Sequence, residues 1–69
     1  MAFTSKPGTI KTWYVARRPM PDGRIGLYVE TRKSAIGMDA LTPIHVVMAI
    51  TAADAERRFL AREWTGLLP

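Results

Sequence analysis

The sequence predicts a small α+β domain in which a three-stranded antiparallel sheet carries one C-terminal helix on a single face (β-β-β-α). Three observations support this prediction. Two β-branched and aromatic runs flank an Asp-Gly turn, an apolar run of strand length follows, and a capped helical run comes last. The 69 residues, with no cysteine, leave room for one sheet and one helix, stabilised by packing rather than by disulfides.

A hairpin is expected to begin the domain. Residues 1–8 have no periodicity and form an expected flexible lead-in, so residues 9–69 make one binding domain. Thr9 to Arg18 is rich in β-branched and aromatic residues, which favour a strand. Prolines and Asp22-Gly23 then break the run and favour a tight turn. Arg24 to Arg32 alternates apolar and other residues, which predicts the returning strand.

The second half of the chain predicts a loop and a third strand. Residues 33–43 lack a sustained period, so we expect a long loop that holds one helical turn near Met38 to Leu41. Ile44 to Ile50 is nearly continuous in apolar residues and mostly β-branched, and its length suits a buried strand.

The helix is expected to follow that strand directly. Thr51 is a suitable N-cap, and Asp54 places a carboxylate in the first turn. Ala52 to Trp64 contains mostly good helix formers, and Gly66 is expected to end the helix.

Strand alternation predicts which face the helix covers. The apolar positions of the returning strand should point at the helix: Ile25, Leu27 and Val29. From the first strand, either Trp13 and Val15 or Tyr14 and Ala16 should join them. We choose Trp13 and Val15, because tryptophan buries more apolar area.

The opposite face then gathers arginines and tyrosines. Its expected members are Tyr14, Arg18, Arg24, Tyr28 and Arg32. Aromatic rings stack on bases and guanidinium groups pair with phosphate, so this face is a candidate site for nucleic acid or another anionic partner. The alternative is that tyrosine and arginine are simply ordinary residues of an open antiparallel face.

The charge of the chain favours anionic partners. Ten Lys and Arg against six Asp and Glu give a net charge of +4 and a pI near 10.1, and seven of the ten are Arg. The alternative is that this charge serves solubility alone. Without cysteine, a signal peptide or a membrane-spanning run, we expect a cytoplasmic protein that does not contact a membrane.

The helix carries a second candidate surface. An apolar edge with Leu60 and Trp64, together with a basic stripe of Arg58 and Arg62, predicts a protein contact at these four residues. Two alternatives remain: a tilted helix whose Trp64 is covered by Leu67 and Leu68, and an Arg58 that only pairs with Asp54 at the i, i+4 spacing.

The inventory of reactive groups argues against an enzyme. His45 is the one histidine and lies in an apolar run, where a satisfied or half-buried ring is expected, while Ser5 and Ser34 lie in expected loops. We therefore predict a non-enzymatic protein with no catalytic residues, no metal site, no cofactor and no small-molecule substrate.

One resemblance adds to this interpretation. Trp13–Arg17, Pro21–Arg24 and Thr51–Ala55, followed by Phe59 and Leu60, resemble the small arm-type DNA-binding domain of phage integrases (tyrosine recombinases). The resemblance covers about residues 11–62 and implies three strands and a helix, with the sheet in the DNA major groove. It also implies a phage or mobile-element protein whose partner is DNA.

The chain departs from that family in its long loop before the third strand and in having no recombinase domain after the helix, so integrase activity is not implied. The alternative function is inhibition. In its small size and simple organisation the chain is similar to phage anti-CRISPR proteins, which implies binding to a host nucleic-acid-handling protein complex. Either hypothesis is compatible with a homodimer.

Overall fold

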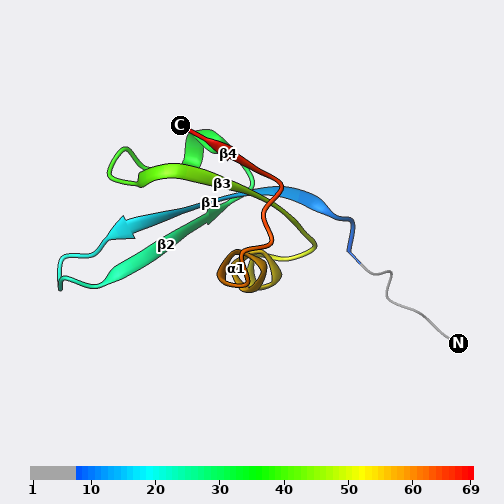
Figure 1. Ribbon diagram of the computed structural model, residues 1–69, viewed down its shortest axis with the longest axis horizontal. Helices are drawn as coiled ribbons and strands as arrows, with labels where there is room; N and C mark the ends of the chain where they lie inside the picture. The colour runs from blue at the N-terminus through cyan, green and yellow to red at the C-terminus, as the bar shows by residue number, and fades with distance from the viewer. Residues whose placement is uncertain (1–7) are drawn as a thin grey trace, which may run out of the picture.

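A four-stranded antiparallel sheet with one helix against one face forms the fold (Figure 1). The computed structural model describes residues 8–69, so residues 1–7 of the expected lead-in lie outside the described residues. In chain order the elements are β1 (Lys11–Pro19), β2 (Ile25–Glu30), the 3-10 helix η1 (Lys33–Ala35), β3 (Leu41–Ala49), α1 (Ala52–Leu60) and β4 (Gly66–Leu68). The predicted α+β class and antiparallel pairing are confirmed, whereas the predicted number of three strands is wrong.

The additional strand is β4, which pairs with the edge of β3 in a sheet of order β2-β1-β3-β4. Gly66 lies opposite Val46, and the N–H of Thr65 donates to the carbonyl oxygen of Val46 at 2.8 Å. A strand of three residues is too short to show alternation, and it forms here because β3 offers unpaired backbone groups. The fourth strand therefore depends on tertiary structure.

The predicted hairpin between β1 and β2 is confirmed. The two strands pair in a regular antiparallel register in which Val15 faces Val29. Gly23 has a φ of 86°, which explains the preference for glycine at this turn position. The N–H of Arg24 donates to the Asp22 carboxylate at 3.0 Å, so the side chain of Asp22 helps to close the turn.

The core lies between the sheet and α1, on the face predicted from alternation. Trp13 and Val15 are buried, which confirms that this pair faces the helix. Phe59 and Val47 are buried beside them, and Leu27 packs against the cluster. The indole N–H of Trp13 donates to the carbonyl oxygen of Ala49 at 2.9 Å, so the polar atom of the largest core residue is satisfied.

The start of α1 matches the prediction. The side chain of Thr51 accepts a hydrogen bond from the N–H of Asp54 at 3.1 Å, as an N-cap should. The carboxylate of Asp54 then pairs with Arg58 at 2.9 Å, so the i, i+4 pair is confirmed. The same carboxylate also accepts from Arg57.

The end of α1 differs from the prediction, because the helix stops at Leu60 rather than continuing to Trp64. Arg62 has a φ of 62°, in the left-handed region. The N–H of Glu63 bonds the carbonyl of Arg58 at 2.8 Å, and the N–H of Arg62 bonds that of Phe59 at 3.0 Å. These two bonds form a Schellman C-cap, which usually has glycine at the position that Arg62 occupies. Gly66, which was expected to end the helix, instead begins β4.

The segment of residues 31–40, here called the crossover segment, passes over the sheet face opposite α1. Because β2 and β3 are both antiparallel to β1, they run parallel to each other, and a connection between parallel strands must cross β1. Ala16 is fully buried although it lies on the face away from α1. The face that the sequence predicted to be uncovered is therefore partly covered.

The local structure of this segment also departs from the prediction. Its one helical turn is η1, whereas residues 37–40 form a single hydrogen-bonded turn in which the N–H of Ala40 donates to the carbonyl oxygen of Gly37 at 3.1 Å, and Leu41 already belongs to β3. Among the described residues, no helix is both long enough and apolar enough to cross a membrane.

Candidate functional site

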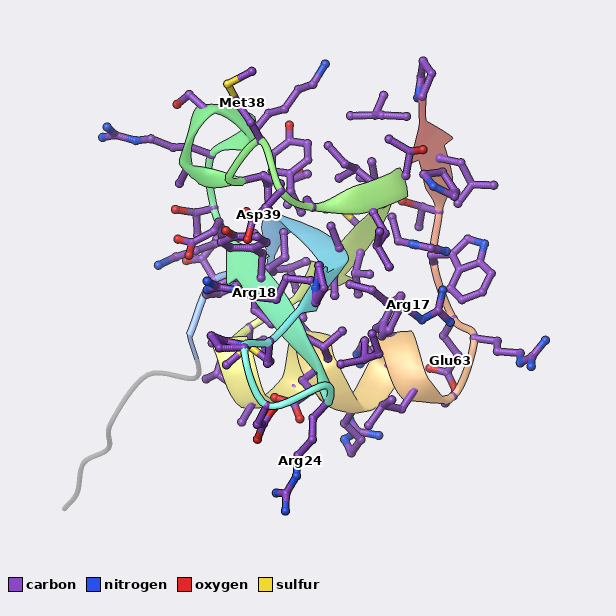
Figure 2. All side chains as sticks on the ribbon, turned by 90° about the vertical axis from the view of Figure 1, so that its left-hand side faces the viewer. Arg17, Arg18, Arg24, Met38, Asp39 and Glu63 are labelled. Carbon is purple, nitrogen blue, oxygen red and sulfur yellow. The ribbon has the colours of Figure 1, made fainter. Side chains whose placement is uncertain are left out.

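The predicted arginine and tyrosine face contains one close pair, Arg18 and Tyr28. The guanidinium carbon of Arg18 lies 4.3 Å from the ring centroid of Tyr28, within the range of a cation–π contact. Asp39, from the crossover segment, accepts a hydrogen bond from the Tyr28 hydroxyl and lies 3.9 Å from the Arg18 guanidinium. Figure 2 shows Arg18 and Asp39 on the same side of the sheet. The pair is thus held in place by a carboxylate that the sequence analysis did not assign to the site.

The electrostatics of Tyr28 follow from this contact. The hydrogen bond to Asp39, together with burial, raises the pKa of Tyr28 above its usual value of 10.0, although the charge of Arg18 opposes the change. The phenol therefore stays a neutral donor at physiological pH. Gly37 lies against this hydroxyl so closely that a Cβ atom there would overlap it, which explains glycine at this position.

The other three predicted members of this face are separated from the pair. Arg24 lies in the hairpin turn with its side chain 86% exposed, 3.5 Å from Asp22, and Figure 2 shows it pointing into solvent away from Arg18. Arg32 is exposed and precedes η1. Tyr14 is half-buried in β1, opposite Glu30. The structure therefore contains one ordered centre with separate flanking groups, rather than a continuous row of five.

A groove lies on the opposite face of the sheet, the face that α1 covers, where the strands meet the end of the helix. It is called the helix-end groove below, and its lining side chains are Arg17, His45, Phe59, Leu60, Arg62 and Trp64. Three of the four residues predicted for a protein contact meet here. The exception is Arg58, which pairs with Asp54 and is not part of the lining.

Aromatic and cationic contacts build the floor of the helix-end groove. The guanidinium carbon of Arg17 lies 5.4 Å from the ring centroid of Phe59. The ring of His45 makes edge-to-face contacts with Trp64 at 4.3 Å and with Phe59 at 4.8 Å. Leu60, in contrast, is 67% exposed at the rim. The groove therefore combines a cation on an aromatic ring with an exposed apolar side chain.

Burial determines the charge state of His45, which is only 6% exposed. Desolvation lowers the pKa of His45 below its usual value of 6.5, and the nearby charge of Arg17 lowers it further. Its Nδ1 atom is buried and has no hydrogen-bond partner among the described residues. His45 is therefore a neutral ring within an aromatic cluster at neutral pH.

Arg17 and His45 were not predicted as groove residues from the sequence. Arg17 has the same strand parity as Trp13 and Val15, and it faces Leu27 in the register of β1 and β2. An arginine on the core side of a strand, near the strand end, was a signal that could have identified it. For His45, the contact with Trp64 depends on the early end of α1, which the sequence did not indicate.

Residues 8–69 contain no group of three or more His, Cys, Asp or Glu side chains placed to hold a metal ion. The prediction that the protein is not an enzyme remains a prediction.

Comparison with other proteins gives no further guide: no protein-family model, curated protein or solved structure matches this chain. The resemblance to integrase arm-type domains therefore also stays a prediction.

Proposed function

We propose that this chain is a non-enzymatic cytoplasmic protein that binds nucleic acid through the sheet face opposite α1. The observation that carries the proposal is the stacked pair of Arg18 and Tyr28, held by Asp39. A guanidinium plane that is already ordered loses less conformational entropy when a base stacks on it. Unpaired bases stack on arginine and tyrosine side chains, so single strands are the preferred ligand.

The groups around the pair have different expected roles. Asp39 already neutralises part of the charge of Arg18, so Arg18 is expected to contribute stacking more than phosphate binding. Arg24 and Arg32 are exposed at the two ends of β2, where they can follow a phosphate backbone. Tyr14, half-buried on the same face, offers a second stacking ring.

Fluorescence anisotropy with a labelled single-stranded oligonucleotide, at several salt concentrations, tests this proposal. Arg32→Gln should flatten the slope of log K against log salt by about 0.7. Tyr14→Ala should weaken binding by about 1–3 kcal/mol with little change in slope. Arg57→Gln is the matched control, because it removes one charge from the helix instead of the sheet face. Absence of binding at low salt, or equal effects of Arg32→Gln and Arg57→Gln, would contradict a site on this face.

A second function is supported by the helix-end groove: inhibition of a nucleic-acid-handling protein complex by direct contact. The supporting observation is that Leu60 is 67% exposed beside Arg62 and Trp64. Exposed apolar residues next to arginine and tryptophan are typical of protein contacts. Capture of a partner from nuclease-treated host lysate by the wild type, but not by Leu60→Ser, is the expected result. Capture that disappears after nuclease treatment would instead indicate nucleic acid.

A further inference from the structure

We propose that the helix-end groove binds a carboxylate with an adjoining apolar group, as presented by an acidic segment of a partner protein. This inference rests on the second function proposed above and names the chemistry of its partner. Arg17 supplies the charge, and the aromatic and aliphatic walls supply the apolar contact.

The surroundings of Arg17 leave its guanidinium available to an anion. Among residues 8–69, Arg18, Arg24, Arg57 and Arg58 each lie within ion-pair distance of a carboxylate, and Arg17 does not. Its guanidinium is instead placed over the ring of Phe59, 5.4 Å from the centroid. This contact orients the planar group without using its N–H donors, which remain able to bind a carboxylate with two parallel hydrogen bonds.

The charge along the groove also favours an anion. Arg62 lines the same groove as Arg17 and, within the described part of the chain, makes no ion pair. Glu56 lies in a neighbouring hollow that also borders Arg17. An anion is therefore attracted into the groove by Arg17 and Arg62, whereas Glu56 repels it from the neighbouring hollow.

The apolar walls of the groove favour a protein segment over a nucleic acid. Leu60 and Trp64 line the groove itself, and Ile25 and Leu27 line the neighbouring hollow of about 440 Å³. A hollow of this size accepts an aliphatic or aromatic side chain. Bases stack on aromatic rings, whereas this hollow is lined by the aliphatic side chains of Ile25, Leu27 and Leu60, which suit an apolar side chain of an acidic protein segment.

Two-dimensional NMR of the folded protein with 4-phenylbutyrate as the probe tests the proposal. The carboxylate should produce saturable shifts at Arg17, Leu60 and the indole of Trp64. Its uncharged amide should bind about tenfold more weakly, as expected for the loss of one charge-assisted pair. Inorganic phosphate and a twelve-nucleotide thymidine strand should leave these signals unchanged.

Two variants assign the preference to its residues. Arg17→Met keeps an unbranched apolar side chain but should remove the preference for carboxylate over amide, whereas Arg57→Met should not. Arg62→Met provides a second test that leaves the contact between Arg17 and Phe59 in place, and it should reduce the preference about threefold or more. Thermal unfolding of each variant confirms that it is folded.

The outcomes separate this inference from the function on which it rests. Equal binding of carboxylate and amide would overturn the inference, while the capture test with Leu60→Ser would still stand for the protein contact. Absence of saturable shifts at the groove would also overturn it. Phosphate or oligonucleotide shifts that depend on Arg17 would assign the groove to nucleic acid instead.

Discussion

The two faces of the sheet are covered by different physical means. On one face, α1 places Ala55 and Phe59 against the buried apolar side chains of the strands. On the other, the crossover segment is held by the contacts of Asp39 with Tyr28 and Arg18. Apolar burial is non-directional and sums over many atoms, whereas the polar contacts converge on one carboxylate. We therefore expect the helix-covered face to determine global stability and the crossover face to open locally.

The largest effect is expected from Phe59, the main helical contribution to the core. Phe59→Ala should lower the free energy of unfolding by about 3–5 kcal/mol, which is close to the whole stability of a domain of this size. Loss of the circular dichroism signal and of the cooperative thermal transition is the expected readout. The neighbouring change Leu60→Ala removes an exposed side chain and should alter stability by no more than about 0.5 kcal/mol. Similar losses for both variants would show that α1 is not oriented as described.

The pH dependence of stability tests how dry the helix-covered face is. Burial, reinforced by the charge of Arg17, lowers the pKa of His45 below 6.5. Below pH 6.5 the imidazole of His45 is therefore protonated more readily in the unfolded chain than in the folded chain. The free energy of unfolding should decrease as the pH falls below 6.5 and stay constant above it. Urea unfolding between pH 8 and pH 5 measures this change, and His45→Phe should abolish it. A pH-independent wild type would mean that water reaches the ring.

A smaller and more local effect is expected on the crossover face. Tyr28→Phe removes the hydroxyl that donates to Asp39 and should speed amide hydrogen exchange in the crossover segment. The thermal midpoint should change much less than in Phe59→Ala. Tyr14→Phe is the matched control, because its hydroxyl makes no contact with Asp39 among the described hydrogen bonds. Unchanged exchange in Tyr28→Phe would show that apolar contacts, rather than this hydrogen bond, hold the segment.

The smallest effect concerns the turn that ends α1. Arg62→Gly should raise the free energy of unfolding by about 1 kcal/mol, because glycine adopts a positive φ without steric cost. Arg62→Ala, which removes the charge but keeps the strain, should give no such gain. Ala61→Gly is the positional control and should be destabilising, since Ala61 has a φ of −83°. Chemical denaturation of the three variants decides between conformational and electrostatic causes, and a gain for Arg62→Ala would indicate the latter.

Local patterns in the sequence were sufficient to predict the hairpin, the third strand, the start of α1 and the sheet face that it covers. The alternation that ends at Val29 and the Asp-Gly turn at Gly23 predicted the hairpin and its buried face. The apolar run before Thr51 predicted the strand and the helix start. These features could be predicted because period-2 burial, turn conformation and N-capping each depend on residues close together in the chain.

Only the tertiary structure decided the rest. Asp39 reaches Tyr28 across eleven positions, and the crossover segment that brings it there has no period to predict its path. The strand at Gly66 forms because β3 has a free edge, and Arg62 ends the helix although glycine is usual at such a position. The sequence thus determined the elements whose energetics are local. The two candidate sites depend on contacts between distant segments, whose free energy exists only once the sheet is assembled.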